Sequence, residues 1–242
     1  MTVPVIIPLG EGSTHNNAEL RFLLRSLERN ALDLGEVYIA TVYPPEWLQG
    51  ACVVPIPDTH AHCKDANLID KTLRVIERCR LDSFAWCADD NAIVQPVRLD
   101  SIPLLYNEHV RSDFGNGSKW HRRILNTFAW ADSQGVPLEH SFESHAPQFF
   151  RDAQELAQRM RRTPYVKGDG LTIMTAFRVV MRETAGGLPQ SRLKDTYEKE
   201  CEEAVKAATF RKPFIGYNDS GVNCGILDRL EELFPEKSRF EK

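Results

Sequence analysis

The chain has 242 residues, a formal net charge of −4, 42% hydrophobic residues and 26% charged residues. Its length is enough for one domain with a sizeable core. No stretch reaches the roughly 18 consecutive apolar residues of a membrane helix, which argues against a membrane partner. The acidic excess disfavours a protein that binds nucleic acid without selectivity, because such proteins are usually basic. The opening residues 1–4 lack the pattern of a signal peptide, so we expect a single cytoplasmic domain over 1–242.

Strand and helix patterns alternate through the first half of the chain. An apolar, β-branched run over 3–9 is broken by glycines, and leucines then recur at helical spacing over 16–31. Asn16 and Glu19 have the spacing of a capping box, which marks the start of that helix. Further strands are predicted over 36–42, 51–56 and 84–89, and a helix over 65–79. This alternation indicates an α/β fold with a mainly parallel central sheet and helices on both faces.

The second half of the chain is predicted to be mostly helical. Helices are predicted over 119–132, 148–161, 171–181, 193–208 and 222–234, and one further strand over 92–97. Basic residues gather over 119–123 and again over 159–167. Each basic group would either face an anionic partner or form the solvated face of a helix.

The most informative motif is the apolar run that ends in Asp89, Asp90 and Asn91. A buried strand explains the run, and its two carboxylates then emerge at the sheet edge where α/β proteins bind ligands. Carboxylate oxygens hold Mg²⁺ or Mn²⁺, which would stabilise the negative charge that grows on a departing nucleotide diphosphate. The alternative is an ordinary polar turn, since Asp and Asn favour turns.

The loop after the first strand contains Pro8, Gly10, Gly12 and Ser13. Its glycines allow the backbone to approach a nucleotide closely. Because the carboxyl ends of parallel strands lie side by side, this loop and Asp89 are expected to line one crevice. The candidate contacts of a donor nucleotide are therefore Pro8, Gly10, Gly12, Ser13 and Asp89.

Four other side chains are candidates for the site. Glu143 and His145 lie just before a proline, where His145 would act as a general base or as a third metal ligand, or belong to a helix-entry turn. Asp169 lies between two glycines, in a loop that would close over substrate or cap the following helix. Lys71, inside a predicted helix, would reach a donor phosphate or face solvent. Glu143, His145 and Asp169 are the candidate catalytic residues.

The segment Ala18–Leu27, the motif Pro45-Glu46-Trp47-Leu48 and the strand ending in Asp89-Asp90 resemble the glycosyltransferase A fold of bacteriophage-encoded glycosyltransferases. The likeness covers residues 3–95. The same residues are also similar, more distantly, to the core of Stealth-type sugar-phosphate transferases. The resemblance implies a nucleotide-sugar donor and a metal-binding Asp-X-Asp-like motif at Asp89 and Asp90. Residues 1–97 would form the nucleotide-sugar-binding half and 98–242 the acceptor side.

The chain departs from both families in places. The strict Asp-X-Asp order is absent, and Ile7–Gly12 replaces the Trp-Val-Asp-Gly opening of the Stealth proteins. The segments His140–Pro147 and Phe234–Glu241 add to the phage-like character.

These features together predict a glycosyltransferase that uses Mn²⁺ or Mg²⁺ and a nucleotide diphosphate sugar. The phage-like character and the basic groups make a hydroxymethylated base in DNA one candidate acceptor, which would place the protein in the host cytoplasm. A saccharide is the other candidate acceptor. Two further classes stay open: a sugar-phosphate transferase, and a non-catalytic protein that binds a nucleotide or nucleic acid.

Overall fold

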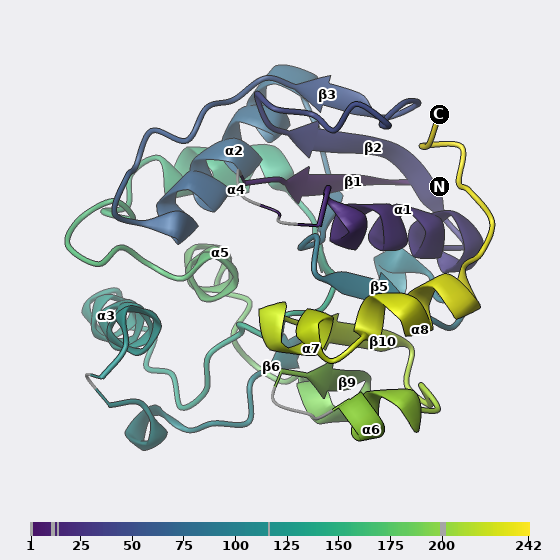
Figure 1. Ribbon diagram of the computed structural model, residues 1–242. Helices are drawn as coiled ribbons and strands as arrows, with labels where there is room; N and C mark the ends of the chain where they lie inside the picture. The colour runs from purple at the N-terminus through teal and green to yellow at the C-terminus, as the bar shows by residue number, and fades with distance from the viewer. Residues whose placement is uncertain (1, 11–12, 14, 116, 199–201) are drawn as a thin grey trace.

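The computed structural model describes residues 2–10, 13, 15–115, 117–198 and 202–242. Its centre is a five-stranded sheet in the order β3-β2-β1-β4-β7 (Figure 1). The strands are β1 (Val3–Pro8), β2 (Leu34–Ala40), β3 (Cys52–Val54), β4 (Phe84–Trp86) and β7 (Gln148–Phe150). The first four are parallel to one another, and β7 is antiparallel to β4. The predicted α/β class with a mainly parallel central sheet is therefore confirmed.

Side chains of β1 alternate between two hydrophobic clusters, as the period of a strand requires. Val5 and Ile7 pack with leucines of α1 (Ala18–Asn30) on one face of the sheet. Ile6 packs on the other face, where α2 (Lys64–Cys79) and α4 (Ala153–Met160) supply the covering side chains (Figure 1). Burial on both faces explains why β1 is almost entirely apolar.

The order of the strands reverses direction at β1. From β1 the chain continues to β2 and β3 on one side, and it returns to β4 on the other. Open α/β sheets bind ligands at the carboxyl ends of the strands where the order reverses in this way, here β1 and β4. Gly10 follows β1 by two residues and Asp89 follows β4 by three, so both lie at this position.

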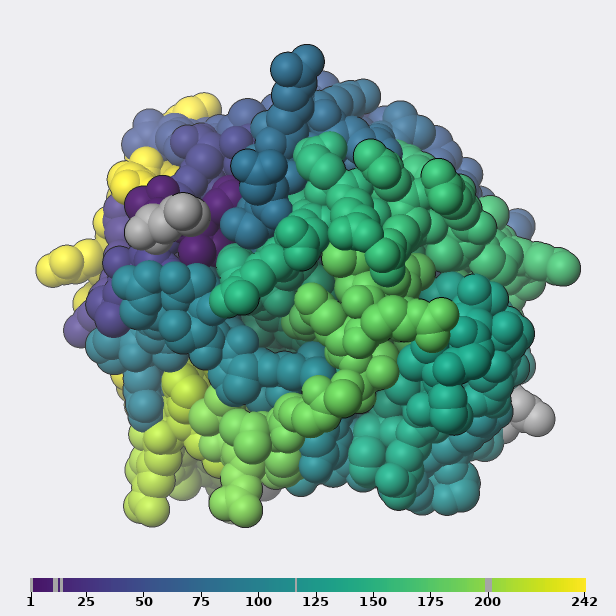
Figure 2. Space-filling model, turned by 180° about the vertical axis from the view of Figure 1, so that it is seen from behind, coloured from purple at the N-terminus to yellow at the C-terminus, as the bar shows by residue number. Residues whose placement is uncertain are grey.

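A second, three-stranded sheet continues from the end of β4. Its strands are β5 (Asn91–Ile93), β10 (Phe214–Tyr217) and β9 (Lys194–Tyr197). β5 is antiparallel to β10, and β9 is parallel to β10. On the rear of the molecule, the light-green chain around β8 (Leu188–Pro189) lies beside the teal chain around β6 (Leu105–Tyr106), with which it pairs (Figure 2).

The remaining elements are helices of the second half and three short 3₁₀ turns. They are α3 (Lys119–Ser133), α5 (Ile173–Met181), α6 (Glu202–Lys206), α7 (Asp219–Asn223) and α8 (Ile226–Leu233), with the turns Leu99–Ser101, Arg111–Asp113 and Gln190–Arg192.

The expectation of a mostly helical second half is wrong in three places. Residues 148–150 form β7, because Phe150 packs in the core beside Phe84 of β4, and α4 begins only after Asp152, whose φ is 51°. Residues 194–197 form β9, where pairing with β10 overrides local helix preference. The helix predicted over 222–234 is divided at Gly225, whose φ of 88° ends one helix and starts the next.

The predicted capping box is also wrong. Asn16 and Asn17 both have positive φ, and α1 starts at Ala18 without a side-chain cap. Ser13 organises the turn instead: its hydroxyl donates to Glu19 Oε2 at 3.0 Å and accepts from the Asn17 N–H at 3.0 Å. Glu19 is therefore held toward the preceding loop rather than toward Asn16.

The C-terminal segment returns to the edge of the central sheet. Phe240 is buried against the same face as α1, and Glu241 pairs with Arg25 of α1 at 2.8 Å. The five described cysteines carry free thiols. Among the helices that the described residues form, none has both the length and the apolar character needed to cross a bilayer.

Candidate functional site

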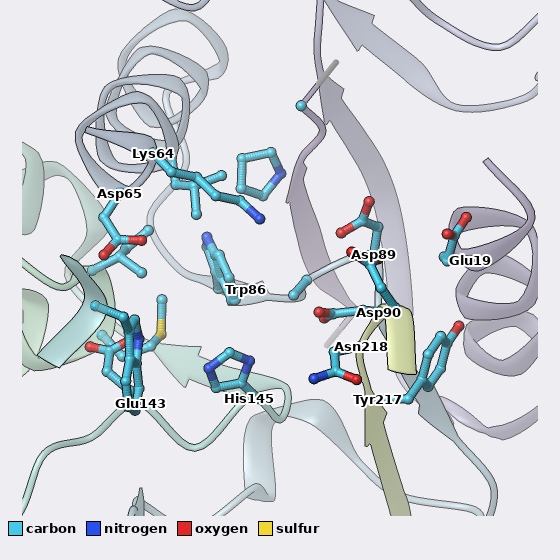
Figure 3. A pocket seen from close by; sticks show the side chains of 18 of the residues that line it. Glu19, Lys64, Asp65, Trp86, Asp89, Asp90, Glu143, His145, Tyr217 and Asn218 are labelled. Carbon is cyan, nitrogen blue, oxygen red and sulfur yellow. The ribbon is translucent and has the colours of Figure 1, made fainter. Parts of the chain in front are cut away.

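A cavity of about 470 Å³ opens at the carboxyl ends of β1 and β4. Its walls come from loops and helices spread over the chain, from Pro8 to Val222. Figure 3 shows Asp89 and Glu19 at one end of the cavity and Asp65 and Glu143 at the opposite end. The predicted crevice at this edge of the sheet is therefore present.

The loop after β1 and the acidic pair after β4 meet in the cavity. Pro8, Gly10 and Ser13 line it together with Asp89 and Asp90. Gly12, the remaining residue predicted in this loop, lies outside the described residues.

Burial and nearby charges shift the pKa values of Asp89 and Asp90. Burial raises the pKa of Asp89 above its usual range, and the neighbouring Asp90 carboxylate raises it further. Burial likewise raises the pKa of Asp90, partly opposed by the positive charges of Lys64 and Lys194. The Lys64 ammonium also lowers the pKa of Asp89, and no arginine is among the main causes of either shift within the described residues. The pair therefore has a charge that a bound cation would relieve.

The segment that carries His145 is fixed by its backbone. Its φ is 45°, a left-handed value that costs free energy for a residue with a side chain. The carbonyl of His145 accepts a hydrogen bond from the buried amide of Asn91 at 3.0 Å. Gly216 of β10 allows this approach, because a Cβ there would lie 3.0 Å from the same carbonyl oxygen. The histidine thus lines the cavity in a conformation that its neighbours impose.

The His145 residue is exposed where it lines the cavity. Desolvation by the surrounding cavity walls lowers the pKa of the imidazole, and the positive charge of Lys194 lowers it further. The ring is therefore uncharged near neutral pH and has a nitrogen able to accept a proton.

Glu143 lies at the far end of the cavity and is only 7% exposed. Its Oε1 accepts hydrogen bonds from the backbone N–H of Thr175 at 2.8 Å and from the Thr175 hydroxyl at 3.0 Å. Burial, with the nearby Asp65 carboxylate, raises the pKa of Glu143 to about 7. A carboxyl group in this state exchanges a proton readily near neutral pH.

Two predicted site residues lie elsewhere. Lys71 is 2% exposed, and its ammonium donates to the Leu9 carbonyl at 2.7 Å and pairs with Asp58 at 2.7 Å, so it neither faces solvent nor lines the cavity. The Asp169 side chain pairs with Arg122 of α3 at 3.2 Å and also does not line the cavity. Asp169 does not cap α5 either, since Thr172 precedes that helix.

The structure adds four residues that sequence reasoning missed. Lys64, the first residue of α2, points from the helix toward the middle of the cavity (Figure 3). Asp65 forms a salt bridge of 2.8 Å with Arg123 of α3, and Trp120 lines the cavity one turn before that arginine. The prediction that this helix starts at 65 hid Lys64. No local pattern pairs Asp65 with a residue on a distant helix.

The predicted three-residue metal site is not assembled. Among the described residues no three His, Cys, Asp or Glu side chains come together as ligands, and Figure 3 shows His145 apart from Asp89. Asp89 and Asp90 nevertheless suit Mg²⁺ or Mn²⁺, since such ions are often held by one or two carboxylates plus water and substrate phosphates. The negative charge of the pair, which Lys64 and Lys194 offset only in part, fits this arrangement.

Searches of known proteins returned no matching family model and no matching curated protein.

Proposed function

We propose that the protein is a glycosyltransferase of the glycosyltransferase A type, which moves a sugar from a nucleotide diphosphate sugar to a hydroxyl acceptor. One observation carries this proposal: a pair of carboxylates without an arginine partner among the described residues faces a cavity at the strand-order reversal of a parallel sheet. Acidic groups at this position suit a cation bound together with a diphosphate.

Different residues of the cavity would have different roles in such a reaction. Pro8, Gly10 and Ser13 would contact the nucleotide, and Lys64 would contact its phosphates, supported by the positive end of α2. A cation bound at Asp89 and Asp90 would supply Lewis-acid stabilisation of the departing diphosphate.

In the transfer step, the acceptor hydroxyl oxygen forms a bond to the anomeric carbon of the donor sugar. The bond between that carbon and the diphosphate oxygen breaks, and its electron pair leaves with the diphosphate. The acceptor proton passes to the uncharged ring of His145. The products are the nucleoside diphosphate, the glycosylated acceptor and the protonated histidine.

Thermal unfolding with a panel of UDP-, GDP- and dTDP-sugars, with and without Mn²⁺, tests donor binding. A donor at a hundredfold excess over its Kd stabilises the native state by about 2.7 kcal/mol. We expect Mn²⁺-dependent stabilisation by at least one donor, and its loss in Asp89→Asn. Asp82→Asn is the matched control, because this exposed aspartate precedes β4 whereas Asp89 follows it, and it should keep the response.

Product analysis separates the rival functions. Glycosyl transfer releases a nucleoside diphosphate, whereas sugar-phosphate transfer releases a nucleoside monophosphate. A donor that binds and is never consumed would indicate a non-catalytic binding protein. Equal donor responses in wild type and Asp89→Asn would contradict the assignment of the acidic pair.

A further inference from the structure

Four arginines of the two basic groups are paired with carboxylates, whereas Lys119, Arg162 and Lys167 of the same groups are exposed and lie outside the cavity. In the first group, Arg123 pairs with Asp65 at 2.8 Å and Arg122 pairs with Asp169. In the second group, Arg159 pairs with Glu155, and Arg161 pairs with Asp70 and Glu77. A protein that holds a nucleic-acid backbone needs positive charge directed at phosphates, and these arginines are already neutralised by carboxylates.

The cavity itself is acidic. Among the described residues that line it, the acidic residues are Glu19, Asp65, Asp89, Asp90, Glu143 and Asp219, and the positively charged residues are Lys64 and Arg123. Arg123 is committed to Asp65, which leaves Lys64 to attract an anion. One lysine and a bound cation suit the diphosphate of a donor, whereas a second, polyanionic substrate would be repelled.

The end of the cavity away from the acidic pair combines an aromatic side chain with fixed polar groups. Trp120 lies one helical turn before Arg123 on α3 and lines the cavity, where its ring also contacts the ring of Phe114. Arg123 is fixed a second time, because its Nε donates to the Asp169 carbonyl at 2.8 Å. Glu143 is fixed by Thr175 of α5.

We propose that this end of the cavity, formed by Trp120, Asp65, Arg123 and Glu143 and here named the acceptor subsite, binds a neutral sugar ring rather than a DNA base. This inference rests on the proposed function and names its acceptor. A sugar ring has an apolar C–H face, which packs on an aromatic ring, and a rim of hydroxyl groups, which hydrogen-bond to carboxylates and a guanidinium. The subsite provides both, with Trp120 and Arg123 on α3, Asp65 on α2 and Glu143 in the loop before β7.

The acceptor subsite lies beside the residue that would take the proton. Figure 3 shows His145 and Trp86 between the two ends of the cavity. A sugar hydroxyl directed from the subsite toward the donor would form the new glycosidic bond at the anomeric carbon. The diphosphate leaves with the electron pair of the broken bond, and the hydroxyl proton goes to His145.

The test compares two acceptor classes with the same donor. Methyl glycosides of glucose, galactose, mannose, rhamnose and N-acetylglucosamine are one panel, and oligonucleotides with 5-hydroxymethylcytosine or 5-hydroxymethyluracil are the other. Mass spectrometry detects the glycosylated product, and diphosphate release gives the rate. We expect transfer to at least one methyl glycoside and none to either oligonucleotide.

Variants of α3 test the role of Trp120. Trp120→Ala should raise the acceptor KM about tenfold, because it removes the aromatic face on which the sugar ring packs, while the donor-dependent thermal shift persists. Trp120→Phe keeps an aromatic face and should recover most of the affinity. Trp130→Ala, on the same helix but outside the cavity, is the control and should leave the acceptor KM unchanged.

Several results would overturn the inference. Transfer to hydroxymethylated DNA, or an acceptor KM that is equal in wild type and Trp120→Ala, would rule out the subsite while leaving the donor assignment in place. Donor binding and donor consumption without transfer to any methyl glycoside would do the same. If no nucleotide sugar binds or reacts, the proposed function fails and the acceptor subsite fails with it.

Discussion

The buried carboxyl group of Glu143 disfavours the folded state at neutral pH, the same pH at which it exchanges a proton readily. Glu143 is buried, and its pKa is raised to about 7 from an ordinary value of 4.5. The folded protein therefore retains a proton that the unfolded chain releases. The contribution of this group to stability is fully present below pH 4.5 and is lost as the pH rises to 7.

Glu143→Gln removes this titration while keeping the size of the side chain and an oxygen for Thr175. We expect the free energy of unfolding of Glu143→Gln, relative to wild type, to increase between pH 4.5 and 7 by on the order of 3 kcal/mol and then to level off. Urea unfolding at a series of pH values in metal-free buffer measures this difference. Glu139→Gln, an exposed glutamate in the same loop, controls for the charge change. A difference that does not vary with pH would show that Glu143 is not perturbed.

Site residues were predictable where the sequence itself marks a boundary. Asp89 and Asp90 stand out because they end an apolar run, and Glu143 and His145 because they adjoin a proline. Trp120 carries no such mark, since an aromatic residue at helical spacing usually belongs to a core. Only the tertiary structure, in which Arg123 of α3 pairs with Asp65 of α2, shows which side chains of α3 reach the cavity.

At the scale of elements, one close contact joins the second sheet to the cavity. Gly221 in α7 packs so tightly on β9 that a Cβ there would lie 2.2 Å from the Tyr197 carbonyl oxygen. The N-cap of α7 is Asn218, whose side chain accepts hydrogen bonds from the N–H groups of Ser220 and Gly221. Asn218 and Val222 line the cavity, so this contact also positions a part of the site.

Gly221→Ala should therefore lower the free energy of unfolding by about 1–3 kcal/mol, because an added methyl group would force backbone to move. Gly117→Ala is the control, because nothing lies within 4 Å of a Cβ at that glycine, and a surface change of this kind costs less than about 0.5 kcal/mol. Chemical denaturation measures both. Equal stability of the two variants would show that α7 shifts freely from β9.

Elements with a clear period were predicted well, and short strands were not. β1, α1, α2 and α3 lie within two residues of the predicted bounds, since each buries an apolar face of its own. β9 has the sequence Lys-Asp-Thr-Tyr, which has no strand pattern and becomes a strand through pairing with β10. Such pairing depends on the rest of the fold.

At the scale of the whole molecule, the two ends of the chain are joined through a buried ion pair. Arg25 of α1 donates to both carboxylate oxygens of Glu241, at 2.8 Å and 3.0 Å, and both side chains are almost fully buried. Arg25 also donates to Glu231, which is 55% exposed. The contact holds the last residues against the core.

Glu241→Ala leaves the Arg25 guanidinium buried without its main partner, and it should cost about 3 kcal/mol of unfolding free energy. Glu231→Ala removes an exposed partner of the same arginine and should cost less than about 1 kcal/mol. Urea denaturation of the two variants side by side provides the measurement. A similar small loss in both would mean that the C-terminal segment adds little to the fold.

The parallel pairing of the central strands followed from the alternation of strands and helices in the sequence, but the second sheet did not follow from any local rule. Its strands come from residues 91–93, 194–197 and 214–217, far apart in the sequence. Contacts over such distances determine the walls of the cavity.

Residues 87–90, which include the acidic pair, connect β4 of one sheet to β5 of the other. A small rotation between the sheets would alter the spacing between the two acidic groups and the loop after β1. A ligand bound in the cavity would accordingly restrict the rotation between the two sheets. The ligand-bound protein would then be stiffer than the ligand-free protein, without any change of topology.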